Sequence, residues 1–142
     1  MASPDPLYRT DAEWQQRLTP LEFQVCRCSA TEPAFSGCYW DHHEPGIYTC
    51  RGCGQSLFDS RHKFDSGSGW PSFYQGIGVL QLLEDHQYGL LRTEVRCAQC
   101  HSHLGHRFDD GPMPTGKRFC INSAALSFQA AHPLDPSPEK QT

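Results

Sequence analysis

The sequence predicts a mainly β domain of short antiparallel strands, preceded by two short helices. The 142 residues are the length of one ordinary domain. They include 12 glycines and 11 prolines, more helix-breaking residues than a helical bundle usually carries. After Ser29, turn-forming sequences recur between short runs of aromatic and β-branched residues. We therefore expect one domain over residues 1–142, ordered from about residue 8 to residue 128.

The two helices are expected before residue 29, and the second has clear end signals. Thr19 can cap its first turn, Pro20 fits the first helical position, and Glu22 can complete a capping box with Thr19. We expect this helix to end at about Arg27.

Strands are expected between the turn signals that follow. The candidates are residues 46–50, the region around residues 72–84, residues 90–97 and residues 117–128. Beyond them, the polar and proline-spaced tail of residues 129–142 is expected to be flexible.

Charge and hydropathy exclude several classes of protein. The net charge is −4 and the cationic residues are scattered, so no basic patch is available for nucleic acid. The chain has no basic and apolar leader at its start and no apolar run near the ~20 residues of a membrane span. These features predict a cytoplasmic protein without a membrane partner.

Eight cysteines in a reducing compartment are expected to be metal ligands or redox groups rather than a disulfide framework. Cys50 and Cys53 form one CxxC pair, and Cys97 and Cys100 form another. Four thiolates at this spacing suit a tetrahedral zinc ion, with two redox-active CxxC pairs as the alternative. Because four sulfur ligands leave no open coordination position, the zinc is expected to be structural.

Cys120 lies outside these pairs, in the sequence RFCINS. If residues 117–122 form a strand, Arg118, Cys120 and Asn122 share one face, while Phe119 and Ile121 share the other. Arg118 could then stabilise a Cys120 thiolate, and Asn122 could donate a hydrogen bond to an anion. The alternative is a buried free cysteine that acts as a small hydrophobic residue.

Histidines and one tryptophan could complete a site around Cys120. His103 and His106 follow the second cysteine pair and could supply protons near neutral pH, whereas His101 is expected to be an exposed loop residue. Trp70 stands between a Gly-Ser-Gly turn and Pro71, where its ring could belong to the core or form the wall of an apolar pocket.

Four separated motifs together resemble the methionine-(R)-sulfoxide reductase B family. They are TEPAFSG (31–37), GIYTCRGCGQSLFDSRHKFDSGSGWPSFY (46–74), VRCAQCHSHLGHRFDDGP (95–112) and GKRFCINSAALSF (116–128). The resemblance runs from about Trp14 to Phe128. It implies two small antiparallel sheets with N-terminal helices, one structural zinc, and thiol-dependent reduction of the R epimer of methionine sulfoxide in oxidised proteins.

The resemblance also implies roles for individual residues. Cys120 would be the nucleophile in a site with His103, His106, Asp110, Arg118 and Asn122; Trp70 and Phe119 would bind substrate; Cys50, Cys53, Cys97 and Cys100 would hold zinc.

Ser68 departs from the pattern of the family. Many members have a cysteine between the two glycines, where it resolves the oxidised nucleophile, and serine cannot do this. The resemblance points instead to Cys38, which would form a disulfide with Cys120 that thioredoxin reduces. Cys26 and Cys28 are the alternative resolving residues, but neighbours two apart on a helix point about 200° away from each other. We expect a monomer.

Two other functions remain compatible with the residues alone. A zinc-ribbon binding module would show slow, uniform labelling of its thiols, whereas an enzyme would show one fast site at Cys120. A Cys-His hydrolase would act on an acyl substrate and would be indifferent to the loss of Cys38.

Overall fold

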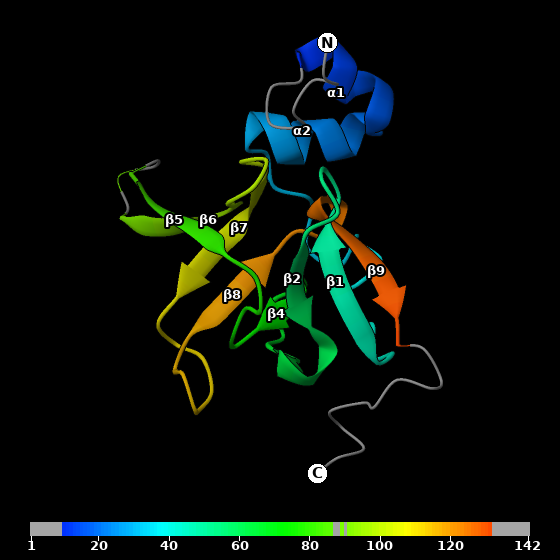
Figure 1. The fold of residues 1–142 in the computed structure, drawn as a ribbon. Helices are drawn as coiled ribbons and strands as arrows, with labels where there is room; N and C mark the ends of the chain where they lie inside the picture. Colours follow the sequence, from blue (N-terminus) through cyan, green and yellow to red (C-terminus); the bar gives the residue numbers. More distant parts are fainter. Residues whose placement is uncertain (1–9, 87–88, 90, 132–142) are drawn as a thin grey trace.

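A computed structural model describes residues 10–86, 89 and 91–131. The two helices lie together across one end of two antiparallel sheets (Figure 1). The sequence therefore predicted the mainly β class and the N-terminal helices correctly. In the described residues, neither helix is long and apolar enough to cross a bilayer.

The elements follow in chain order. They are α1 (Asp11–Arg17), α2 (Pro20–Cys28), β1 (Gly46–Cys50), β2 (Ser56–Asp59), the 3-10 turn η2 (Ser60–His62), β3 (Lys63–Phe64), β4 (Ser72–Phe73), β5 (Leu80–Asp85), β6 (Arg92–Cys97), β7 (His103–Phe108), β8 (Arg118–Ile121), the 3-10 turn η4 (Ser123–Ala125) and β9 (Leu126–Ala130).

Both helices begin with a capping box. The Thr19 hydroxyl accepts a hydrogen bond from the backbone N–H of Glu22, and the Glu22 carboxylate accepts one from the backbone N–H of Thr19. Thr10 and Glu13 make the same pair of bonds at α1. Such caps satisfy N–H groups that the first turn leaves unpaired. The capping box predicted for the second helix is confirmed.

The small sheet has the strand order β2-β1-β9 and the large sheet the order β3-β4-β8-β7-β6-β5. The expected strand over residues 117–128 is wrong as a single element, since η4 divides it into β8 and β9. The Asn122 side chain marks the division: its Nδ2 donates to the carbonyl of Leu104 at 3.0 Å. As a result β8 pairs with β7 in the large sheet, whereas β9 pairs with β1 in the small one.

The region around residues 72–84 is also two strands rather than one, since β4 and β5 are separated by a turn containing Gly76 and Gly78. Three further strands, β2, β3 and β7, were not expected from the sequence. The expected ordered span stays a prediction: residues 8 and 9 and residues 132–142 lie outside the described part, and β9 continues past Phe128 to Ala130.

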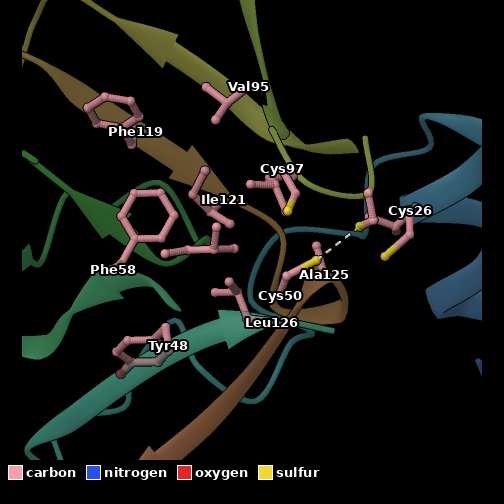
Figure 2. Packing of buried hydrophobic residues seen from close by; sticks show 14 of the residues in the cluster. Cys26, Tyr48, Cys50, Phe58, Val95, Cys97, Phe119, Ile121, Ala125 and Leu126 are labelled. Carbon is pink, nitrogen blue, oxygen red and sulfur yellow. Dashed lines mark hydrogen bonds between the residues drawn. The ribbon is translucent and has the colours of Figure 1, made fainter. Parts of the chain in front are cut away.

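The core lies between the two sheets and is rich in aromatic rings (Figure 2). The rings of Phe58 and Phe73 stack with centroids 4.4 Å apart. Phe119 packs against Phe58 at 5.9 Å, and Ile121 is fully buried on the same face of β8. The predicted alternation on this strand is confirmed, because Arg118 and Cys120 are only partly buried on the other face.

Candidate active site

Cys120 opens onto a cleft of about 370 Å³ on the face of the large sheet opposite the core. The cleft is lined by Thr31, Ser68, Trp70, Arg92, Gly105, His106, Phe108, Arg118, Cys120 and Asn122. The site residues expected from the sequence that meet here are Trp70, His106, Arg118, Cys120 and Asn122. They come from the loop before β4, from β7, from β8 and from the residue that follows β8.

The pairing of β7 with β8 sets the floor of the cleft. His106 lies directly opposite Cys120, and Phe108 lies opposite Arg118. Paired residues in antiparallel strands share a face, so all four side chains project into the cleft. Gly105 allows the close approach, because a Cβ atom there would collide with the carbonyl group of Cys120.

Arg118 is held by two partners. Its Nε and Nη2 donate to the carboxylate oxygens of Asp110 at 2.8 and 3.2 Å. The guanidinium also lies over the Phe108 ring, 4.4 Å from its centroid. Asp110 therefore reaches the site through Arg118 and does not line the cleft itself.

Burial raises the pKa of the Cys120 thiol above its ordinary value of 9.0. The Ser68 hydroxyl and the Arg118 guanidinium lower this pKa, but they do not offset the loss of hydration. Arg118 thus acts on the thiol in the expected direction, but burial has the larger effect. In the ligand-free protein burial therefore favours the thiol form of Cys120.

The two histidines have parallel surroundings. His106 Nε2 lies 2.7 Å from a carboxylate oxygen of Asp85, and His103 Nδ1 lies 2.7 Å from one of Glu94. A carboxylate only accepts hydrogen bonds, so each of these ring nitrogens carries a proton. Arg92 lies 3.2 Å from Asp85 and so completes a triad with His106.

The histidines differ in access to the cleft. His106 lines both the cleft and a second, polar cavity of about 460 Å³, whereas His103 lines only the second cavity. His103 is 3% exposed, and burial lowers its pKa although Glu94 acts in the opposite direction. The ring centroids lie 5.5 Å apart. The structure therefore brings His106, and not His103, to the face of Cys120.

Trp70 and Asn122 are fixed by the loop that follows α2. The indole N–H of Trp70 donates to the carbonyl of Glu32 at 3.0 Å. The Asn122 amide oxygen accepts from the backbone N–H of Glu32, also at 3.0 Å. Glu32 is 1% exposed, and its carboxylate accepts from the backbone N–H of Ala124. This loop therefore braces one wall of the cleft.

Phe119 is not brought to the cleft. It lies in the core, on the face of β8 opposite Cys120, so the structure does not support the expected contact with substrate.

The four paired cysteines form one cluster, with their sulfur atoms all within 4.8 Å of one another. The Cys50–Cys100 and Cys53–Cys97 sulfur pairs are each 3.5 Å apart. A tetrahedral zinc with Zn–S bonds of about 2.3 Å requires sulfur separations of about 3.8 Å, so the cluster fits this ion. Cys50 ends β1 and Cys97 ends β6, so the cluster joins the two sheets (Figure 2).

Three further cysteines lie outside the cluster and the cleft. Cys38 is exposed and lines a cavity of about 340 Å³ that also contains Glu32 and Ser123. Cys26 is 2% exposed, and burial raises its pKa to about 12. Cys28 is exposed at the end of α2.

Several residues of the site were missed by the sequence analysis. Asp85, Arg92, Glu94 and Phe108 lie near the predicted residues only because the strands pair as they do, and Thr31 comes from the loop that follows α2. One signal was available for Phe108: it is two residues after His106, and in a strand that spacing places both on one face.

Comparisons with known proteins agree on one family. The model of the SelR domain matches residues 18–130. A protein of Thioalkalivibrio sulfidiphilus called peptide methionine sulfoxide reductase MsrB is 55% identical over 125 residues, covering 87% of this chain and 91% of its own. A protein of that name from Thiobacillus denitrificans is 51% identical over 137 residues, covering 95% and 100%. One from Herminiimonas arsenicoxydans is 53% identical over 135 residues, covering 94% and 98%.

Proposed function

The chain belongs to the MsrB family of peptide methionine sulfoxide reductases and is an oxidoreductase, and we propose that it reduces the R epimer of methionine sulfoxide in proteins. In this proposal Cys120 is the nucleophile and thioredoxin is the final reductant. The observation that carries it is the meeting of Cys120, Trp70, His106 and Arg118 in one cleft.

Substrate binding would use the two aromatic walls of the cleft. Trp70 and Phe108 offer apolar surface for the methyl and thioether part of the side chain. The sulfoxide oxygen would then point toward His106 on the floor. An asymmetric arrangement of apolar wall and proton donor around one sulfur atom can distinguish two epimers, because only one presents its methyl group and its oxygen to the correct sides.

The reaction would consume the thiol of Cys120. The sulfur, as a thiolate, attacks the sulfoxide sulfur and forms an S–S bond, while the sulfoxide oxygen receives a proton. The hydroxyl then passes to the Cys120 sulfur as both the S–O bond and the new S–S bond to the methionine sulfur break, so Cys120 is oxidised by two electrons and the sulfoxide is reduced by two. The products are methionine and a sulfenic acid at Cys120. Since Cys120 is a thiol before substrate binds, its own proton must leave during this step.

His106 is the proposed proton donor, for two reasons. It lies opposite Cys120 across the strand pair, whereas His103 does not line the cleft. In addition, its hydrogen bond to Asp85 fixes the orientation of the ring. Arg118, held by Asp110, would support the negative charge at sulfur.

Cys38 is the proposed resolving residue. Its exposure and its place in a cavity with Ser123, three residues along the chain from Cys120, support this role. The buried Cys26 has a raised pKa and so forms a thiolate less readily. The Cys38 thiol would attack the Cys120 sulfenic acid, giving a disulfide and water, and thioredoxin would reduce the disulfide.

The cysteine cluster would hold one structural zinc in a monomeric, cytoplasmic protein. Its four thiolates would occupy every position of the ion, so its contribution is to hold β1 and β6 together.

The test of the proposed activity uses separated epimers. Zinc-bound protein with thioredoxin should reduce peptides that contain the R sulfoxide and leave the S sulfoxide unchanged, and Cys120→Ser should release no methionine from either. Reduction of the S epimer at an equal rate would contradict the proposal.

A second experiment tests the resolving residue. Cys38→Ser should release about one methionine per protein molecule and then stop with thioredoxin as reductant. Cys28→Ser is the matched control, since it also removes an exposed thiol, and it should turn over normally. Continued turnover of Cys38→Ser would assign the role to another thiol.

A further inference from the structure

Three serine hydroxyls lead in a row from Cys120. Ser68 Oγ lies 3.9 Å from Cys120 Sγ, which is within reach of a hydrogen bond to sulfur. Ser66 Oγ lies 2.8 Å from that of Ser68 and 2.6 Å from that of Ser72. The row ends where the Ser72 hydroxyl donates to the backbone carbonyl of Trp70 at 3.1 Å.

The number of protons determines the direction of these bonds. Each hydroxyl has one hydrogen to donate, and a carbonyl can only accept. Because Ser72 donates to the Trp70 carbonyl, Ser66 must donate to Ser72, and Ser68 must donate to Ser66. Ser68 then has only acceptor capacity toward Cys120. The observed row therefore suits a neutral thiol, whose S–H can donate to Ser68.

A thiolate has no hydrogen to donate, so it requires the opposite direction. We propose that the three hydroxyls reverse together when Cys120 ionises: Ser68 donates to the sulfur, Ser66 to Ser68, and Ser72 to Ser66. The proton leaves the sulfur for water in the cleft, each hydroxyl rotates about its Cβ–Oγ bond, and the Trp70 carbonyl loses its serine donor. Ser68 is thus a catalytic residue, whereas Ser66 and Ser72 act through it as positioning residues.

The other groups that face Cys120 leave room for such a donor. Arg118 on the same strand shares its guanidinium with Asp110, and Glu32 raises the pKa of the thiol by charge repulsion. His106 on β7 donates to Asp85, and Arg92 on β6 pairs with the same carboxylate. The Ser68 hydroxyl lowers the Cys120 pKa through a hydrogen bond, and Arg118 lowers it through its charge and a hydrogen bond.

Cooperation along the row explains why three serines are needed. A hydroxyl that accepts a hydrogen bond becomes a better donor, so Ser66 and Ser72 strengthen the bond that Ser68 gives to the thiolate. The inference rests on the proposed role of Cys120 as nucleophile. Its test is the acidity of the thiol, which can be measured without substrate and so can fail independently of the proposed activity.

The experiment measures the rate at which iodoacetamide alkylates Cys120 in the zinc-bound protein as a function of pH. The tryptic peptide that begins at Phe119 contains no other cysteine, so mass spectrometry reads this site alone. Ser68→Ala should react about ten-fold more slowly at pH 8, the size expected for one hydrogen bond to a charged group. Ser68→Thr keeps the hydroxyl and should react at nearly the wild-type rate.

Ser66→Ala tests the cooperation, because its hydroxyl does not touch the sulfur. Ser66→Ala should slow alkylation about three-fold. Ser127→Ala is the control: it removes a hydroxyl on β9 that accepts a hydrogen bond from Arg51, and it should have no effect. An unchanged rate in Ser68→Ala would overturn the inference. If Cys120 is alkylated slowly in Ser68→Ala but at the wild-type rate in Ser66→Ala, the concerted reversal is overturned. If Ser68→Ala fails to retain zinc, Ser66→Ala and Ser72→Ala test the inference in its place, because Cys120 must be alkylated more slowly in both variants than in the wild type.

Discussion

Cys120 owes its acidity to opposing effects on a single sulfur atom. Burial in the cleft raises the pKa, while Ser68 and Arg118 lower it by a smaller amount. A low reactivity before substrate arrives protects the thiol from indiscriminate oxidation, because the thiolate is the form that oxidants attack.

The first prediction concerns this resting reactivity. Since a raised pKa means less thiolate at any given pH, Cys120 should be alkylated more slowly at pH 7–8 than cysteine in a free peptide, and its rate should continue to rise above pH 9. The measurement is the pH dependence of alkylation in the protein and in a synthetic peptide of residues 117–123. A plateau below pH 8 in the protein would show that the thiol is more acidic than the structure indicates.

The second prediction concerns Asp85, which accepts the hydrogen bond of His106. Asp85→Asn replaces the charged acceptor that fixes the orientation of the His106 ring with a weaker, neutral one, so kcat should fall by about 10–100-fold.

Glu84→Gln provides the matched control on the neighbouring residue. The Glu84 side chain is 77% exposed and contacts His86, so its loss should leave kcat unchanged. Wild-type kinetics in Asp85→Asn would mean that another group holds His106.

At the scale of elements, the pairing of β7 and β8 assembles the site. Sequence patterns predicted β1 and the capping box of α2 because those signals are local. They did not predict β7, because its residues include a glycine and two histidines, which favour no strand by themselves. Its strand conformation comes from pairing with both β6 and β8.

Gly105 provides the third prediction. Gly105→Ala should lower the free energy of unfolding by about 2–3 kcal/mol and reduce activity, because the new methyl group would push β7 away from the carbonyl of Cys120. Urea denaturation of the zinc-bound protein measures the change. Gly116→Ala is the control: its left-handed φ of 72° adds strain of about 1 kcal/mol, but nothing lies near its Cβ. Equal losses would mean that close packing at Gly105 has no special cost.

At the scale of the whole molecule, the cysteine cluster and the covalent chain both connect the two sheets. The cluster could be predicted from the sequence, because two CxxC pairs are a specific pattern. The partners of the histidines could not be predicted, because Asp85 and Glu94 meet them only after β5, β6 and β7 have paired. Phe119 was assigned to the substrate although strand alternation already places it opposite Cys120.

The fourth prediction is that metal loss affects the whole fold. Cys53→Ser removes one of four ligands and should abolish stoichiometric zinc, lower the midpoint of thermal unfolding and inactivate the protein, although Cys53 does not line the cleft. Zinc analysis and thermal unfolding give the readout, with Cys28→Ser as the cysteine control. Retention of one zinc and full stability in Cys53→Ser would exclude the cluster as the metal site.

The division of one chain segment between β8 and β9 has a mechanical consequence. Since β8 belongs to the large sheet and β9 to the small one, separating either sheet from its neighbours pulls on the few residues that follow Cys120. The Cys120 sulfur therefore reports on transient separation of the sheets. The rate at which it reacts with a bulky thiol reagent that cannot enter the closed cleft would measure how often the domain opens.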